Sequence, residues 1–172
     1  MLIYYADQCD KKKCTSIKIN DSKDKLSFKV IWTQKSNAIR QNSIVLTPNT
    51  STFLTKSDKT IVDRFGITIL DCSWKQGQKY LNDWSFLNGR KLPPLIAGNP
   101  VNYGKWEKLT SLEALASSFY IIGLDSLSNE LLGLYNWGKT FLDLNQELLN
   151  VYRECSTQED VVNAYNSFFS LK

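Results

Sequence analysis

The segment of residues 90–116, RKLPPLIAGNPVNYGKWEKLTSLEALA, constrains the fold most, because it predicts a buried strand, an irregular loop and a helix in immediate succession. Residues 92–97 form an apolar run short enough for a buried strand, and two prolines confine it to the edge or the start of a sheet. Thr110 or Ser111 precedes the next apolar run, with Glu113 placed for a capping box. A loop that leaves a strand of a parallel α/β sheet is a usual place for a ligand, so we expect this loop to bind one.

Alternating or short apolar patterns predict strands in the first half of the chain, at residues 2–6, 26–33, 43–46 and 67–70. Residues 75–87 instead have apolar side chains at helical spacing, and Gly89 follows them as a stop signal. In the second half, apolar residues at intervals of three and four predict helices at residues 111–122, 127–137, 139–152 and 158–169. We therefore expect an α/β protein that divides near Arg90 into domains of residues 1–90 and 91–172.

The absence of histidine from all 172 residues excludes histidine acid–base catalysis and the commonest zinc sites. Cys9 and Cys14 flank a lysine-rich stretch, but no second Cys/His pair exists to complete a metal site. Cys72 has no histidine to activate it as a nucleophile, so packing is its expected role. We expect no metal ion in this protein.

Charge and hydropathy set broad limits on location and partners. The net charge of +4 permits an RNA partner without requiring one. Met1 leads directly into a strand-like run rather than a signal peptide, and no apolar run is long enough to span a membrane. We expect a cytoplasmic monomer without membrane contact.

Three stretches of the sequence together resemble a known family. They are CDKKKCT at residues 9–15, LDCSW at residues 70–74, and the string RKLPPLIAGNPVNYG with LTSLEALA after it. In these motifs, residues 1–120 resemble the small-subunit (16S/18S) ribosomal RNA aminocarboxypropyltransferase family, in its archaeal form. The chain departs from the family pattern at Lys11, where proline is usual, and at Gly98, where alanine is usual. We expect the Gly98 change to be minor.

The resemblance implies transfer of the 3-amino-3-carboxypropyl group from S-adenosylmethionine to N3 of a (1-methyl)pseudouridine in small-subunit ribosomal RNA, during ribosome biogenesis. Methylthioadenosine would be released, and the partner would be that RNA or its precursor particle. The resemblance also implies an N-terminal α/β domain followed by a C-terminal SPOUT-like domain with a deep trefoil knot. Knots are rare among folds, and periodicity cannot reveal one.

S-adenosylmethionine requires apolar walls for its adenine, backbone hydrogen bonds and a partner for its positive charge. By resemblance, the walls around the adenine would be Leu46, Pro48, Trp74, Leu92, Leu109 and Ala114. The backbone groups that bind the ribose and the base edges would belong to Leu92, Glu107, Leu109 and Ser111. Thr15 would hold the amino-acid tail, and Asp71 would be the catalytic residue that accepts or orients the N3 proton.

These residues also have ordinary structural interpretations. The aliphatic side chains would simply pack in a core, and Trp74 would anchor the start of a helix. Asp71 and Ser73 would cap the helix that follows them. The residues alone leave both interpretations open.

Basic residues near the expected cofactor tail are candidates for contact with RNA phosphates. They are Lys11, Lys12, Lys13, Arg64, Lys79, Arg90 and Lys91. The lysine triplet also fits a solvated surface turn. Tyr103 and Trp106 are loop aromatics that could stack an extruded base or close the pocket.

Two other functions fit the same features. The first is a SPOUT-type RNA methyltransferase, which would use the same cofactor but transfer its methyl group. The second is a noncatalytic ribosome-assembly factor that binds precursor RNA through its basic face. The products separate the three, because tail transfer releases methylthioadenosine, methyl transfer releases S-adenosylhomocysteine, and a binding factor releases neither.

Overall fold

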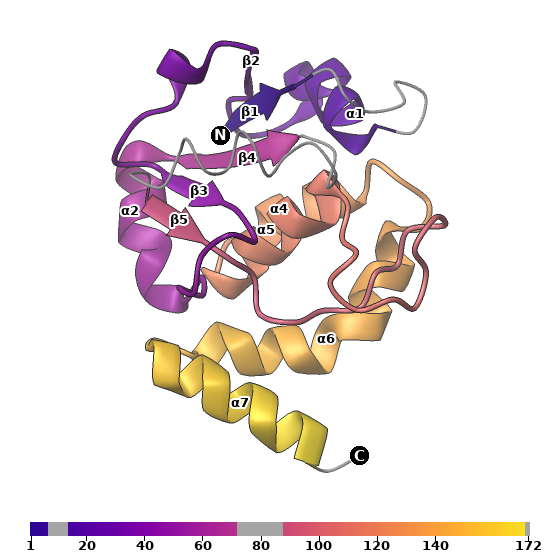
Figure 1. The fold of residues 1–172 in the computed structure, drawn as a ribbon. Helices are drawn as coiled ribbons and strands as arrows, with labels where there is room; N and C mark the ends of the chain where they lie inside the picture. Colours follow the sequence, from indigo (N-terminus) through magenta and orange to yellow (C-terminus); the bar gives the residue numbers. More distant parts are fainter. Residues whose placement is uncertain (7–13, 72–87, 171–172) are drawn as a thin grey trace.

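A five-stranded parallel sheet forms the centre of the protein (Figure 1). The computed structural model describes residues 1–6, 14–71 and 88–170. The strand order is β2 (Ile31–Thr33), β1 (Leu2–Tyr5), β4 (Ile67–Asp71), β3 (Ile44–Leu46) and β5 (Asn88–Arg90), and every neighbouring pair is parallel. Parallel neighbours need crossover connections rather than tight hairpins. The α/β class expected from the sequence is confirmed.

The three inner strands match the apolar runs at residues 2–6, 43–46 and 67–70. β1 and β3 are buried along their whole length, and four of the five residues of β4 are buried. Strands covered on both faces read as continuous apolar runs, which explains why these three predictions are confirmed.

The strand expected at residues 26–33 is too long, because only Ile31–Thr33 enters the sheet, as edge strand β2. Ser27, which lies before β2, has a side-chain partner instead of a neighbouring strand. Its N–H and its hydroxyl both donate to the carboxylate of Glu130, at 2.7 Å each. A backbone group that finds a side-chain partner does not need a neighbouring strand.

Helices make up most of the second half. They are α4 (Ser111–Ile121), α5 (Asp125–Leu132), α6 (Gly138–Glu154) and α7 (Gln158–Ser170). All four expected helices exist, but α5 ends five residues before the expected residue 137. There the chain folds back so tightly that a Cβ on Gly138 would lie 2.0 Å from the Leu132 carbonyl oxygen. None of the helices in the described ranges combines the length and the apolar character needed to cross a bilayer.

Two short helices in the first half were not expected, namely α1 (Thr15–Asp21) and α2 (Lys59–Phe65). Each has seven residues, which is too few turns for a clear apolar period. The helix expected at residues 75–87 lies outside the described residues.

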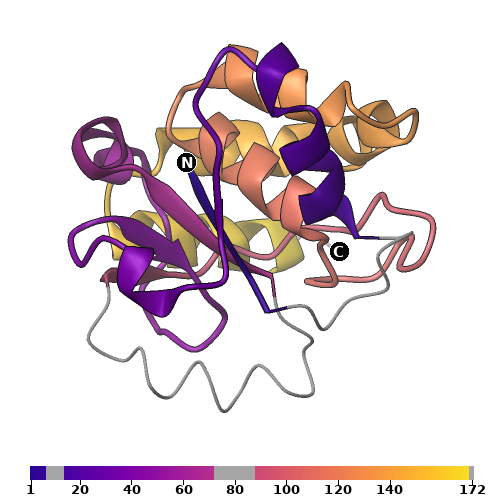
Figure 2. The same cartoon turned by 90° about the horizontal axis from the view of Figure 1, so that it is seen from above.

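One hydrophobic core joins the sheet to the later helices. Helix α4 is at its centre, since it packs against β4, α1, α5 and α6. Figure 2 shows α1 and α4 side by side on the same side of the sheet. The core contains residues from both sides of residue 90, and the division into domains 1–90 and 91–172 stays a prediction.

The prediction of a strand at residues 92–97 is wrong. Strand β5 ends at Arg90, and within residues 92–97 a single isolated bridge joins Ile96 to Trp106. Pro93 and Pro94 have no N–H to give to a strand ladder. Instead, Asn145 of α6 pairs with this segment. Its Oδ1 accepts from the Ile96 N–H (2.7 Å), and its Nδ2 donates to the Ile96 carbonyl (2.8 Å).

The structure contradicts the expectation that glycine in place of alanine at residue 98 is a minor change. A Cβ on Gly98 would lie 2.6 Å from Cα of Phe141, which is backbone and cannot rotate away. We predict that Gly98→Ala lowers the free energy of unfolding by about 1–3 kcal/mol, the usual cost of overpacking. Urea denaturation measures this change.

Gly133→Ala is the matched control, because its added Cβ would lie 3.3 Å from the nearest atom, a carbonyl oxygen of Asn129. We expect it to change stability much less. Equal stability of Gly98→Ala and the parent chain would show that α6 moves away from the loop without cost.

Candidate functional site

A cleft of about 600 Å³ opens where β3, β4 and β5 end. Leu46, Asp71 and Arg90, the last residues of these strands, line it. The start of α4 and residues 107–109 before it contribute the opposite wall. The carboxyl edge of a parallel sheet is the usual position of a ligand, and the volume suits a small molecule.

All predicted cofactor residues that the structure describes line this one cleft. They are Thr15, Leu46, Pro48, Asp71, Leu92, Glu107, Leu109, Ser111 and Ala114. Trp74 lies outside the described residues. The structure therefore brings together residues from five separate stretches of sequence, and their roles toward a cofactor stay predictions.

Asp71 places a buried carboxylate in the cleft, with 6% of the residue exposed. The thiol of Cys14 donates a hydrogen bond to its Oδ2 (3.0 Å), and the Ser111 hydroxyl lies 3.5 Å from Oδ1. The backbone of Asp71 is fixed as well, because its carbonyl accepts from the Ala6 N–H (3.0 Å). Asp71 is therefore held in place while its carboxylate faces the cleft.

Cys14 is a cleft residue that the sequence analysis missed, since it was considered only as a metal ligand. It directly precedes Thr15, and this adjacency to a predicted tail-binding residue was the available signal. In the described part of the chain, no group of three or more Cys, Asp or Glu residues is placed to hold a metal ion.

Two helix N-termini meet at the cleft. α1 begins at Thr15 and α4 begins at Ser111, and the Thr15 hydroxyl accepts from the Leu112 N–H (3.3 Å). The N–H groups of a first helical turn have no partner within the helix and give its end a partial positive charge. The cleft thus combines the partial positive charge of helix N-termini, which suits a carboxylate, with a buried carboxylate that suits a cation.

Glu113 fixes the loop that forms the outer wall of the cleft. The capping box expected with Thr110 is confirmed. The fully buried carboxylate also accepts from the backbone N–H groups of Gly98 (2.8 Å) and Asn99 (2.9 Å) and from the Asn99 amide (2.8 Å). With the N–H and the hydroxyl of Thr110, this makes five hydrogen bonds. One side chain therefore joins the start of α4 to the loop.

The loop itself closes like a small hairpin. The N–H of Ala97 donates to the Lys105 carbonyl (2.9 Å), and the N–H of Glu107 donates to the Leu95 carbonyl (2.9 Å). Glu107 has φ of 59°, a conformation that costs energy for a residue other than glycine. The closure thereby holds Glu107 against the cleft in a strained backbone conformation.

Helix α6 supports the same segment from behind. Besides the pairing of Asn145 with Ile96, the Tyr152 hydroxyl donates to the Pro94 carbonyl (3.3 Å). Burial raises the pKa of Tyr152 well above its ordinary value, so the phenol keeps the proton that it donates. The wall of the cleft is thus held by a helix that does not itself line it.

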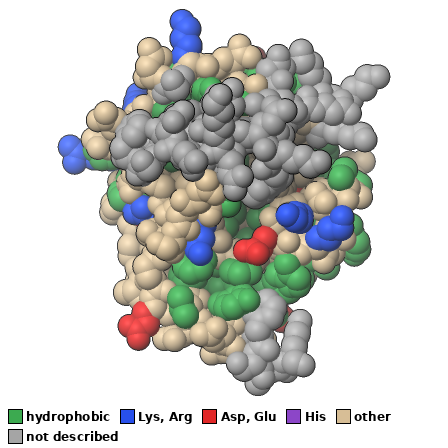
Figure 3. All heavy atoms as spheres, in the orientation of Figure 1, with side chains coloured by type: hydrophobic (Ala, Val, Ile, Leu, Met, Phe, Trp, Pro, Cys, Tyr) green, Lys and Arg blue, Asp and Glu red, His purple; other side chains and the backbone are tan. Residues whose placement is uncertain are grey.

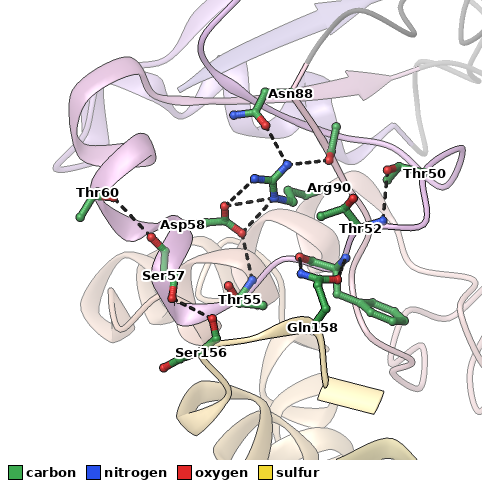
Figure 4. A network of polar contacts seen from close by, with 12 residues as sticks. Thr50, Thr52, Thr55, Ser57, Asp58, Thr60, Asn88, Arg90, Ser156 and Gln158 are labelled. Carbon is green, nitrogen blue, oxygen red and sulfur yellow. Dashed lines mark hydrogen bonds and ion pairs between the residues drawn. The ribbon is translucent and has the colours of Figure 1, made fainter. Parts of the chain in front are cut away.

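Arg90 was expected to contact RNA, but its guanidinium has protein partners (Figure 4). Its Nε and Nη2 lie about 3.0 Å from the carboxylate of buried Asp58, and Nη1 donates to Asn88 (2.7 Å) and to the Gly89 carbonyl (2.9 Å). Asp58 also accepts from the Thr55 N–H (3.0 Å). This geometry favours a structural role, and an RNA contact by Arg90 stays a prediction.

The other basic candidates are spread out. Lys91 lines the cleft, with its Nζ 4.3 Å from the centre of the Phe53 ring. Arg64 is exposed on α2 and lies over the Phe65 ring, so it is not brought to the cleft. The candidates Lys11, Lys12, Lys13 and Lys79 lie outside the described residues.

Comparisons with known proteins show which family this chain belongs to. A family model described as "Ribosome biogenesis protein, C-terminal" matches residues 44–169. The chain is 38% identical over 168 residues to the 16S rRNA aminocarboxypropyltransferase of Methanocaldococcus jannaschii, covering 98% of this chain and 95% of that relative. The chain belongs to the 16S rRNA aminocarboxypropyltransferase family. A second member, from Methanothermobacter thermautotrophicus, is 37% identical, and the alignment covers 98% of this chain and 97% of that relative.

A solved structure extends the family likeness to the fold. It is the SAM-dependent rRNA:acp-transferase Tsr3 from Vulcanisaeta distributa. The two structures superpose with a TM-score of 0.83 at 31% identity, over 99% of this chain and 95% of that one. The α/β architecture around the cleft is therefore the architecture of this family.

We predict that Glu113→Gln lowers the free energy of unfolding by about 2–4 kcal/mol. The amide NH₂ of glutamine would face the donors of Asn99 and Thr110, and their buried N–H groups would lose an acceptor. Thermal or urea unfolding monitored by circular dichroism measures the change. Glu147→Gln, at an exposed position of α6, is the matched control and should leave stability unchanged. A loss no larger than that of the control would contradict the anchoring role.

Proposed function

We propose that this protein transfers the 3-amino-3-carboxypropyl group of S-adenosylmethionine to N3 of a (1-methyl)pseudouridine in small-subunit ribosomal RNA, releasing methylthioadenosine, during ribosome biogenesis. One observation carries the proposal. The described residues that the family resemblance assigns to the cofactor line a single cleft at the carboxyl edge of the sheet. The names of the relatives and of the solved neighbour support the same reaction.

The donor set of the cleft fits S-adenosylmethionine. Leu46, Leu92 and Leu109 offer apolar surface for the adenine. The N-terminus of α4 suits the carboxylate of the amino-acid tail, and the Asp71 carboxylate suits the positive sulfonium. When bound, the cofactor supplies a carbon made electrophilic by the adjacent sulfonium.

The protein's own contribution is positioning. The sulfonium activates three attached carbons, and the one held in line with the nucleophile reacts. The fixed loop and the fixed start of α4 define which part of the cofactor faces the opening. Asp71 accepts or orients the N3 proton, and the hydrogen bond from Cys14 sets the direction of its carboxylate.

The finer architecture belongs to the same proposal. We infer a SPOUT-like C-terminal domain with a deep trefoil knot, and a division near residue 90. The sequence resemblance supports both, and β5, which ends at Arg90, pairs with β3 and so closes the sheet of the N-terminal part. The cytoplasmic location, the monomeric state and the RNA contacts of Lys11, Lys12 and Lys13 are further predictions of this proposal.

The released product tests the proposed reaction. We predict that the protein, S-adenosylmethionine and a small-subunit RNA fragment containing 1-methylpseudouridine yield methylthioadenosine in a ratio of one to each modified nucleotide. Chromatography with mass spectrometry measures both. S-adenosylhomocysteine instead would indicate methyl transfer. RNA binding without either product would indicate a noncatalytic assembly factor.

We predict that Asp71→Asn slows the transfer by about 10²-fold or more while the fold and much of the cofactor affinity remain. The side chains are nearly isosteric, but asparagine cannot take up the N3 proton. Single-turnover kinetics at saturating S-adenosylmethionine measure the rate, and calorimetry measures the affinity. Asp24→Asn, at an exposed position, is the control and should react normally. A rate for Asp71→Asn close to that of the parent chain would leave Asp71 with a purely structural role.

A further inference from the structure

The loop beside the cleft exposes apolar side chains that the cofactor site does not use. Six large apolar side chains are exposed in the described residues, and three of them are Val101 (67% exposed), Tyr103 (59%) and Trp106 (36%). Tyr103 and Trp106 are the two aromatic members of that set. Such a concentration of exposed apolar surface within a few residues is a feature of binding sites.

The cleft lining decides between the two roles expected for these aromatics. Asn102, Glu107 and Lys108 from this loop line the cleft, whereas Tyr103 and Trp106 are not part of its lining. The aromatic rings therefore do not form a wall of the cofactor pocket. They belong to the same loop as the lining residues Asn102, Glu107 and Lys108, and both side chains are exposed.

The loop is also held by several hydrogen bonds, which suits a platform. Glu113 holds Gly98 and Asn99, and Asn145 holds Ile96 from the other side. The N–H of Asn102 donates to the Asn99 side chain (3.0 Å), which fixes the turn between them. A surface that is ordered before binding loses less conformational entropy when a ligand arrives.

The charges around the aromatics suit a polyanion. Lys105 and Lys108 are exposed on either side of Trp106, and the loop carries one acidic residue, Glu107. Figure 3 shows basic and hydrophobic side chains together over the loop that precedes α4. Unpaired RNA offers this combination, because its bases have flat faces that stack on aromatic rings and its phosphates pair with lysine.

We propose that Tyr103 and Trp106 form a stacking platform for unpaired bases of the RNA that flank the target nucleotide, with Lys105 and Lys108 contacting the adjoining phosphates. The position of the platform relative to the reacting base rests on the proposed function. The RNA-binding capacity of the loop does not, so the two can be tested separately.

The test measures binding of a fluorescein-labelled oligouridylate of about ten nucleotides, a length within the usual size of single-strand sites. Tyr103→Ala and Trp106→Ala should each weaken binding about tenfold, the effect of losing one base–aromatic stack. Tyr103→Phe and Trp106→Phe retain a ring and should bind nearly as the parent chain does. Val162→Ala removes an exposed apolar side chain from α7 and is the control.

Transfer kinetics distinguish a role of Tyr103 and Trp106 in RNA binding from a role in the chemical step. For a small-subunit RNA fragment, the alanine variants should raise KM for RNA, leave kcat little changed and leave the affinity for S-adenosylmethionine unchanged. The platform would be overturned if the alanine variants bound RNA as tightly as the parent chain does. It would also be overturned if neither the parent chain nor the variants bound the RNA measurably. A parallel loss of cofactor affinity would show instead that the aromatics close the pocket.

Two further outcomes are distinguishable. Binding that depends on Tyr103 and Trp106 in a protein that releases no methylthioadenosine would support the platform and contradict the proposed function. A dimer of the parent chain that Tyr103→Ala dissociates, seen by light scattering and without a change in RNA affinity, would assign the surface to a second copy of the chain and overturn the platform.

Discussion

The arrangement of the cleft depends on one buried carboxylate. Glu113 is fully buried, and a charge in that position is tolerated only when its oxygens are saturated with donors. The five donors come from Gly98, Asn99 and Thr110, and the partial positive charge of the α4 N-terminus adds to them. Because the loop and the helix start share this one acceptor, neither can move without exposing an uncompensated group. The shape of the cleft follows from that restraint.

Side-chain amides extend the same principle to backbone segments that have no strand beside them. Asn145 of α6 exchanges two hydrogen bonds with Ile96, and Gln158 of α7 exchanges two with Phe53, at 2.6 and 2.8 Å. An amide carries a donor and an acceptor side by side, so it can replace the backbone of a missing neighbour. This explains how the C-terminal helices contribute to a site that they do not line. They complete the hydrogen bonding of segments next to the cleft, since Phe53 pairs with the cleft residue Lys91 and Ile96 follows the cleft residue Leu95.

The sequence predicts the local and the fully buried parts of the fold. The capping box of Thr110 and Glu113 lies within four residues, and the inner strands are plain apolar runs, so both can be read directly. Residues 92–97 show where this reading fails. Their apolar pattern reports burial only at alternate residues, namely Pro93, Leu95 and Ala97. Burial does not specify a strand when two prolines remove donors and the partner is Asn145, 49 residues away. The tight contact of Gly98 with Phe141 is equally invisible without the structure.

The residues of the site also fall into a predictable group and an unpredictable one. The described residues that the family resemblance supplied all line one cleft, and their roles toward a cofactor stay predictions. Spacing along the chain could not bring Thr15, Leu46 and Asp71 together. Basic residues were the least predictable, because a count of charges does not reveal which are already paired. Arg90 is bound to buried Asp58, and breaking such a pair would leave an uncompensated charge. Its charge is therefore already balanced within the protein. In the proposed complex, attraction of RNA to this part of the molecule would therefore depend on exposed cations such as Lys105 and Lys108, which flank Trp106 in the loop before α4.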